Sequence, residues 1–119
     1  MLVEDHADTL AALSKLLSMR GHVVLTADCC ARAMKVAEEA AAKGSPIDLV
    51  IGDIGLPDGD GVLLMCELKG RLGCPVIALS GYGMDGDLQR CAEAGIDRHL
   101  LKPVGAAQLE KEMKRLSDC

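Results

Sequence analysis

The chain has 119 residues, a formal net charge of −5, six cysteines and a single Tyr, with no Trp or Phe. This length predicts one domain over residues 1–119, and a composition that is 50% hydrophobic is enough for an aliphatic core without disulfide bonds. The acidic balance argues against direct binding of nucleic acid, no apolar run approaches the ~20 residues of a membrane span, and an acid at the fourth position argues against a signal peptide.

Short apolar runs alternate with amphipathic stretches along the whole chain. The runs predict strands at residues 2–3, 23–25, 49–51, 76–79 and 100–101. Apolar side chains at helical spacing predict helices that include residues 10–17, 33–40, 64–72, 88–92 and 109–116. Asp28 is the expected cap of the second helix. Because the apolar runs show no polar alternation, we expect a mostly parallel sheet with helices on both faces.

The six cysteines do not form a disulfide or zinc pattern. Cys29 and Cys30 are adjacent, and the remaining four include no C-x-x-C pair. We therefore expect buried, reduced thiols in a cytoplasmic protein. The sequence also begins almost directly at the first predicted strand, which suggests a domain excised from a longer chain.

Polar side chains follow four of the five predicted strands. The first strand ends in Glu4-Asp5, the third in Asp53, the fourth in Ser80 and the fifth in Lys102. Ligands of open α/β sheets bind beyond the carboxyl ends of the strands, so we expect these groups to share one crevice. Three neighbouring carboxylates repel one another unless a cation compensates them.

The residue types in this crevice favour Mg²⁺ and phosphoryl transfer. Mg²⁺ prefers hard oxygen ligands, and no His or Cys follows these strands in a pattern that suits zinc or iron. A carboxylate can form an aspartyl phosphate when positive charge surrounds the transferred group. Asp53 would then be the nucleophile, with Lys102 and the metal supplying charge and Ser80 a hydrogen bond.

Four segments together resemble the receiver domain of response regulators and hybrid histidine kinases. They are VED at residues 3–5, DIGLPDGDG at 53–61, ALSG at 78–81 and LKP at 101–103. The resemblance covers essentially the whole chain. It implies a doubly wound, five-stranded parallel sheet in the flavodoxin-like order 2-1-3-4-5.

The resemblance also implies roles for individual residues. Asp53 matches the phosphoacceptor and Lys102 the phosphate-binding lysine. Asp5 matches a direct ligand of Mg²⁺, and Glu4 matches its acidic neighbour, which acts through water. Gly55 matches the position whose backbone carbonyl binds the metal together with Asp53.

A second group of residues matches the switch of the family. Ser80 matches the hydroxyl that moves toward the phosphoryl group, carrying the following loop with it. The family often has an aromatic residue three positions before the lysine, where this chain has His99, whose ordinary pKa is about 6.5. Tyr82 is placed to admit or exclude water and so to set the phosphoryl lifetime. The Lys102-Pro103 bond is cis in many relatives.

The expected function is that of a phosphoacceptor. The resemblance implies transfer from the phosphohistidine of a histidine kinase or a histidine phosphotransfer domain. It implies a change in the face formed by the fourth helix, fifth strand and fifth helix, which could support a homodimer. A hybrid sensor histidine kinase is the expected parent protein, with a stand-alone regulator as the alternative. The domain would catalyse its own phosphorylation and dephosphorylation, without being an enzyme of the ordinary kind.

Three other functions fit these residues less well. A phosphatase of the haloacid-dehalogenase type needs a second Asp two residues after the nucleophile, where this chain has Gly55. A flavin carrier needs aromatic side chains to stack on the ring. A pseudo-receiver that is never phosphorylated would not need the full set of site residues. Residues 58–61 are expected to serve turns and a helix cap, and His6 to be a loop residue at the rim.

Overall fold

The computed structural model describes residues 1–81, 85–102 and 104–117. Its strands are β1 (Leu2–Val3), β2 (Thr26–Ala27), β3 (Val50–Asp53), β4 (Gly55–Leu56), β5 (Gly59–Asp60), β6 (Val76–Ser80) and β7 (Arg98–Leu101). Its helices are α1 (Ala7–Met19), α2 (Cys30–Ala42), α3 (Gly61–Leu72), α4 (Asp85–Glu93) and α5 (Ala106–Ser117). None of these helices is long and apolar enough to cross a membrane.

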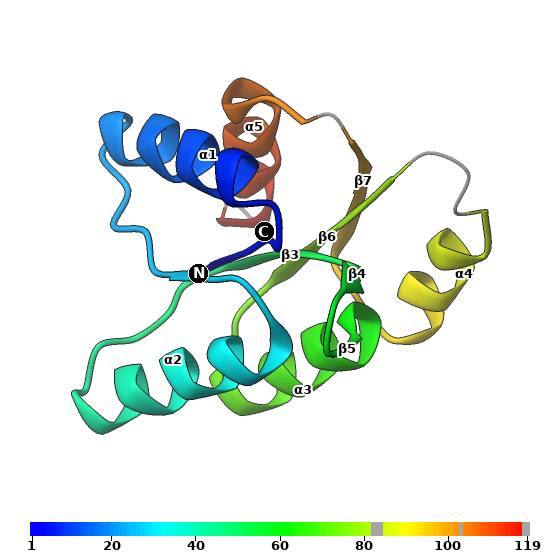
Figure 1. The fold of residues 1–119 in the computed structure, drawn as a ribbon, viewed down its shortest axis with the longest axis horizontal. Coiled ribbons are helices and arrows are strands. Elements are labelled where there is room, and N and C mark those ends of the chain that lie inside the picture. The colour runs from blue at the N-terminus through cyan, green and yellow to red at the C-terminus, as the bar shows by residue number, and fades with distance from the viewer. Residues whose placement is uncertain (82–84, 103, 118–119) are drawn as a thin grey trace.

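Five of the seven strands form one parallel sheet in the order β2-β1-β3-β6-β7. In terms of these five strands alone, this is the expected order 2-1-3-4-5. Strands β4 and β5 form a separate antiparallel hairpin directly after β3. Helices α1 and α5 lie on one face of the sheet, and α2 and α3 lie on the other (Figure 1). The prediction of a doubly wound α/β fold is therefore confirmed.

Successive side chains of the strands enter two different cores. Leu2, Ile51 and Ile77 pack with α1 and α5. Their neighbours Val3, Val50 and Val76 pack with α2 and α3. Because both faces of the sheet are covered, both sets must be apolar, which explains the uninterrupted apolar runs in the sequence. A third cluster contains Val62 of α3 and Cys91 of α4, so α4 packs beside α3.

The second strand differs from its prediction. It was expected at residues 23–25 but lies at Thr26–Ala27, which pair with Leu2 and Val3. Val23 has 93% of its surface exposed. Strand β1 has two residues, and its register places them opposite residues 26 and 27 rather than the apolar run.

The amino end of α2 is capped by a residue that is distant in the sequence. The prediction that Asp28 caps this helix is wrong, because Cys29 occupies the N-cap position. The Cys29 side chain makes no capping bond. Instead, the Asp58 carboxylate accepts hydrogen bonds from the backbone N–H groups of Cys30 (2.7 Å) and Ala31 (3.0 Å). These bonds hold the pKa of Asp58 below its ordinary value. The free amides of a helix amino end favour such an anion.

The cap of α3 follows the prediction for residues 58–61. Asp60 is the N-cap residue of α3 and accepts a hydrogen bond from the Val62 N–H at 2.9 Å. Asp60 also forms an ion pair with Arg90 of α4. The five cysteines within the described residues are free thiols. Cys74 and Cys91 are buried as expected, Cys66 is exposed, and Cys119 lies outside the described residues.

Gly61 is required where α3 begins beside β3. A Cβ at Gly61 would lie 2.3 Å from the carbonyl oxygen of Asp53 and 2.5 Å from the Cα of Ile54. Both are backbone atoms, which cannot turn aside as a flexible side chain can. The absence of a side chain here lets α3 approach the end of β3.

We predict that Gly61→Ala lowers the free energy of unfolding by about 3 kcal/mol, because the added methyl group overlaps the backbone at Asp53. Gly70→Ala is the matched control in the same helix, where a Cβ meets nothing within 4 Å. This control should raise stability by about 0.5 kcal/mol. Urea unfolding of both variants measures the difference. Equal stabilities would contradict the close approach.

Candidate functional site

The sheet register brings the predicted site residues to one edge. Val3 pairs with Gly52, so Glu4, directly after β1, and Asp53, the last residue of β3, lie at the ends of neighbouring parallel strands. Ser80 pairs with Leu101, so Lys102 comes next after the adjacent strand end. This is the carboxyl edge of the sheet, where ligands of doubly wound folds bind.

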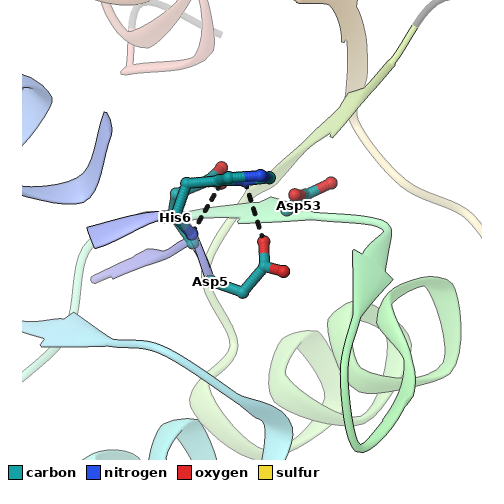
Figure 2. Close-up of side chains that lie close together, drawn as sticks. Asp5, His6 and Asp53 are labelled. Atoms are coloured by element: carbon teal, nitrogen blue, oxygen red, sulfur yellow. Dashed lines mark hydrogen bonds and ion pairs between the residues drawn. The ribbon is translucent and has the colours of Figure 1, made fainter. Parts of the chain in front are cut away.

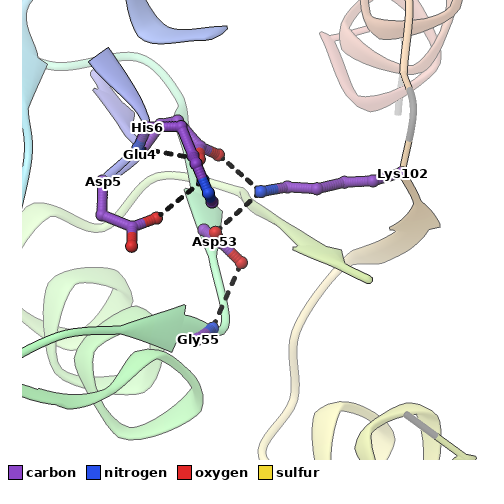
Figure 3. A network of polar contacts seen from close by, with 6 residues as sticks. All are labelled: Glu4, Asp5, His6, Asp53, Gly55 and Lys102. Carbon is purple, nitrogen blue, oxygen red and sulfur yellow. Dashed lines mark hydrogen bonds and ion pairs between the residues drawn. The ribbon is translucent and has the colours of Figure 1, made fainter. Parts of the chain in front are cut away.

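Lys102 joins the carboxylates of β1 and β3. Its Nζ lies 2.7 Å from Glu4 Oε2 and 2.7 Å from Asp53 Oδ2 (Figure 3). Glu4 is completely buried, so its charge requires a partner. Burial alone would lower the pKa of Lys102, but the hydrogen bonds to Asp53 and Glu4 outweigh it and raise the pKa above 10.5. Lys102 is therefore charged at neutral pH, and the stability that its raised pKa contributes is lost as the pH rises through that pKa.

Asp53 is nearly buried, with 6% of its surface exposed. Its Oδ1 accepts a hydrogen bond from the Gly55 N–H at 3.1 Å, and its Oδ2 contacts Lys102. Both carboxylate oxygens are therefore oriented by fixed donors (Figure 3). For Gly55 the structure shows this N–H contact, and the metal-binding role of its carbonyl stays a prediction.

His6 lies beside the two acids that precede it. Its Nδ1 is 2.9 Å from Glu4 Oε1 and 3.3 Å from Asp5 Oδ1. The hydrogen bond with Glu4, and then the charges of Asp5 and Glu4, raise the pKa of His6 above 6.5. The sequence prediction treated His6 as a rim residue and missed these contacts. Its position directly after the acid pair was the available signal.

Glu4, Asp5, His6 and Asp53 form a group that could hold a metal ion. One possible ligand atom from each lies within 4.8 Å of those from the other three. Three of the four are carboxylates, which are ligands that Mg²⁺ accepts. The donor set present therefore fits the predicted magnesium site.

The two predicted switch residues contact each other directly. Ser80 Oγ and His99 Nε2 lie 2.7 Å apart and share a hydrogen bond. Ser80 is 1% exposed, so its hydroxyl depends on this partner. The backbone carbonyl of Ser80 also accepts a hydrogen bond from the Lys102 N–H at 2.8 Å. Tyr82 and Pro103, for which roles were also predicted, lie outside the described residues.

The chain belongs to the family of response regulator receiver domains, since the model of that family matches residues 1–114. The transcriptional regulatory protein KdpE of Mycobacterium tuberculosis is 37% identical over 105 residues, which cover 88% of this chain and 44% of that protein. The KdpE protein of Escherichia coli K12 is 33% identical over 114 residues, 96% of this chain and 48% of that one. The chain thus spans about half the length of these curated relatives.

Solved structures show the same fold. The receiver domain protein from Clostridium thermocellum superposes with a TM-score of 0.87 at 26% identity, covering 98% of this chain and 91% of that one. The receiver domain of NtrX from Brucella abortus gives a TM-score of 0.84 at 27% identity, covering 98% of this chain and 96% of that one.

A further relative by sequence is a histidine kinase. The osmosensing histidine protein kinase SLN1 of Saccharomyces cerevisiae is 25% identical over 113 residues, 92% of this chain and 9% of that protein.

We predict an energetic coupling of about 1 kcal/mol between Ser80 and His99, because His99 is the hydrogen-bond partner of the buried Ser80 hydroxyl. His99→Phe alone should cost about 1–2 kcal/mol, since it leaves the Ser80 hydroxyl without this partner. The double variant with Ser80→Ala should cost less than the sum of the two single variants. Urea unfolding of the four proteins measures the cycle, and additive losses would argue against the hydrogen bond.

We predict that Lys102→Met destabilises the metal-free protein by about 2–3 kcal/mol, because it leaves the buried Glu4 carboxylate without its cation. Added Mg²⁺ should stabilise this variant more than it stabilises the wild type, since the metal replaces the missing charge. Urea unfolding with and without MgCl₂ tests both statements. Lys15→Met, at an exposed position of α1, is the control and should change neither value. An equal response of the two variants to Mg²⁺ would count against the shared site.

Proposed function

We propose that this receiver domain accepts a phosphoryl group on Asp53 from the phosphohistidine of a histidine kinase or a histidine phosphotransfer domain. The observation that carries the proposal is the setting of Asp53, a nearly buried carboxylate at the carboxyl edge whose two oxygens contact Lys102 and the Gly55 N–H. A phosphorus–oxygen bond to Asp53 forms as the phosphorus–nitrogen bond of the donor breaks. The released imidazole nitrogen takes up a proton from solvent.

The side chains around Asp53 supply the charge that such a transfer needs. Lys102 already contacts Asp53 at 2.7 Å, so its ammonium group lies where a phosphoryl group on that oxygen would carry negative charge. Glu4, Asp5, Asp53 and the Gly55 carbonyl would hold Mg²⁺, with Asp5 as a direct ligand and Glu4 acting through water. When bound, Mg²⁺ neutralises the charge on the transferred oxygens.

The contact between Ser80 and His99 supports a switch. A phosphoryl group offers strong acceptor oxygens to the Ser80 hydroxyl, which must leave His99 to reach them. Movement of His99 on β7 and of the segment after Ser80 would then alter the face formed by α4, β7 and α5. That face is the proposed output surface and the proposed site of homodimer formation after phosphorylation.

The parent protein is proposed from the relatives. Those at 33–37% identity are transcriptional regulatory proteins about twice as long as this chain, which favours a response regulator whose remaining half serves transcriptional regulation. The hybrid histidine kinase expected from the sequence is the second candidate, and the similarity to SLN1 supports it. In either parent, this domain would act as the phosphoacceptor.

We predict that incubation with acetyl phosphate and Mg²⁺ adds the mass of one phosphoryl group to the wild-type domain. The gain should disappear in Asp53→Ala and when EDTA removes the metal, because the acceptor or the neutralising charge is then missing. Intact-mass spectrometry measures all three samples.

Asp58→Asn is the matched control for the acceptor assignment. Asp58 lies five residues after Asp53 but turns toward α2, so this variant should still gain one phosphoryl group. Loss of the gain in Asp58→Asn but not in Asp53→Ala would move the acceptor to Asp58. No gain by a folded wild-type domain would indicate a pseudo-receiver that acts by binding alone.

A further inference from the structure

His6 occupies a helix-capping position but does not cap the helix. It is the N-cap residue of α1, with φ −83° and ψ 111°, and its side chain makes no capping bond. Ser, Thr, Asp and Asn are the residues preferred there, because their short side chains reach the free amides. The imidazole turns instead toward the carboxylate of Asp5 (Figure 2) and that of Glu4 (Figure 3). Helix capping therefore does not explain this side chain.

The spacing of the imidazole from the Asp5 carboxylate is close to that of neighbouring ligands around one metal ion. Neighbouring ligands of an octahedral ion with bonds of about 2.1 Å lie about 3.0 Å apart. His6 Nδ1 lies 3.3 Å from Asp5 Oδ1, close to this spacing, and it shares a hydrogen bond with Glu4 Oε1 at 2.9 Å. The Asp53 carboxylate completes a group whose four ligand atoms all lie within 4.8 Å of one another.

His6 is also held in this place and remains accessible. Its backbone N–H donates to the same Glu4 Oε1 at 3.2 Å, so the backbone and the ring share one carboxylate oxygen. Its side chain is 72% exposed, which leaves a path from solvent to the group. The Glu4 carboxylate therefore contacts Lys102 through one oxygen and His6 through the other.

We propose that His6 Nδ1 is a nitrogen ligand of the divalent metal site, and that it shifts the preference of the site from Mg²⁺ toward transition-metal ions such as Co²⁺. This proposal rests on the metal site of the proposed function. Imidazole is a better ligand for the later first-row ions than for Mg²⁺, which favours oxygen. All-oxygen sites also bind Co²⁺ more tightly than Mg²⁺, so the contribution of His6 appears in how the ratio of the two affinities changes when the nitrogen is removed.

The test compares the wild type with His6→Gln, which replaces the ring nitrogen by an amide of similar reach. Calorimetric titration should show Co²⁺ binding weakened about tenfold and Mg²⁺ binding changed no more than about twofold. Proton NMR of the Co²⁺-loaded wild type should show a strongly shifted, exchangeable imidazole N–H from the Nε2 that remains protonated. That resonance should be absent in His6→Gln and should disappear from the wild type in excess Mg²⁺.

His22→Gln is the matched control, because His22 lies near Glu110 rather than near the acid pair. It should leave the resonance and the affinity ratio unchanged. An unchanged ratio in His6→Gln together with no shifted N–H in the wild type would overturn the proposal and make His6 only an ion-pair partner of the acids.

Asp5→Asn separates that result from a failure of the proposed function. Weaker binding of both ions in Asp5→Asn, with His6→Gln unchanged, would overturn the role of His6 and leave the carboxylate site standing. Unchanged binding in both variants would overturn the metal site itself.

Discussion

The contact of one ammonium group with two carboxylates organises this domain. Lys102 follows β7, Glu4 follows β1 and Asp53 ends β3, so the ion pairs join segments that are 98 and 49 residues apart. Glu4 has no exposed surface, and an unpaired charge at such a position would cost several kcal/mol. The sheet register must therefore hold the three strand ends together. The same requirement concentrates negative charge at a point where a metal ion and a phosphoryl group can be accommodated.

Most of the fold was predictable because its main constraint is local. A strand covered on both faces must be apolar throughout, and this burial explains the apolar runs at β1, β3 and β6. The hairpin of β4 and β5 was not predicted, since Gly55–Leu56 and Gly59–Asp60 contain no apolar run. The position of β2 was also wrong, because residues 23–25 satisfy the strand pattern but lie outside the register set by Leu2 and Val3.

The candidate site was likewise predicted only in part. The order of strand ends placed Glu4, Asp53 and Lys102 at one edge, because parallel strands share a direction. The contact between Ser80 and His99 spans 19 residues and depends on where two side chains point, which residue spacing does not record. The turn of His6 toward the acids escaped prediction for a related reason. The sequence shows that Glu4 and Asp5 precede His6. It does not show that the ring of a residue at a helix N-cap faces them.

The capping of α2 by Asp58 makes the domain mechanically asymmetric. The segment after Asp53 is anchored twice, by Gly61 against the backbone at Asp53 and by Asp58 on the amides of Cys30 and Ala31. The lowered pKa of Asp58 keeps this anchor charged even in mild acid. Strain introduced at Asp53 therefore meets a stiff support toward α2 and α3. On the other side, toward β6 and β7, the side-chain contact between the two strand ends is the hydrogen bond between Ser80 and His99.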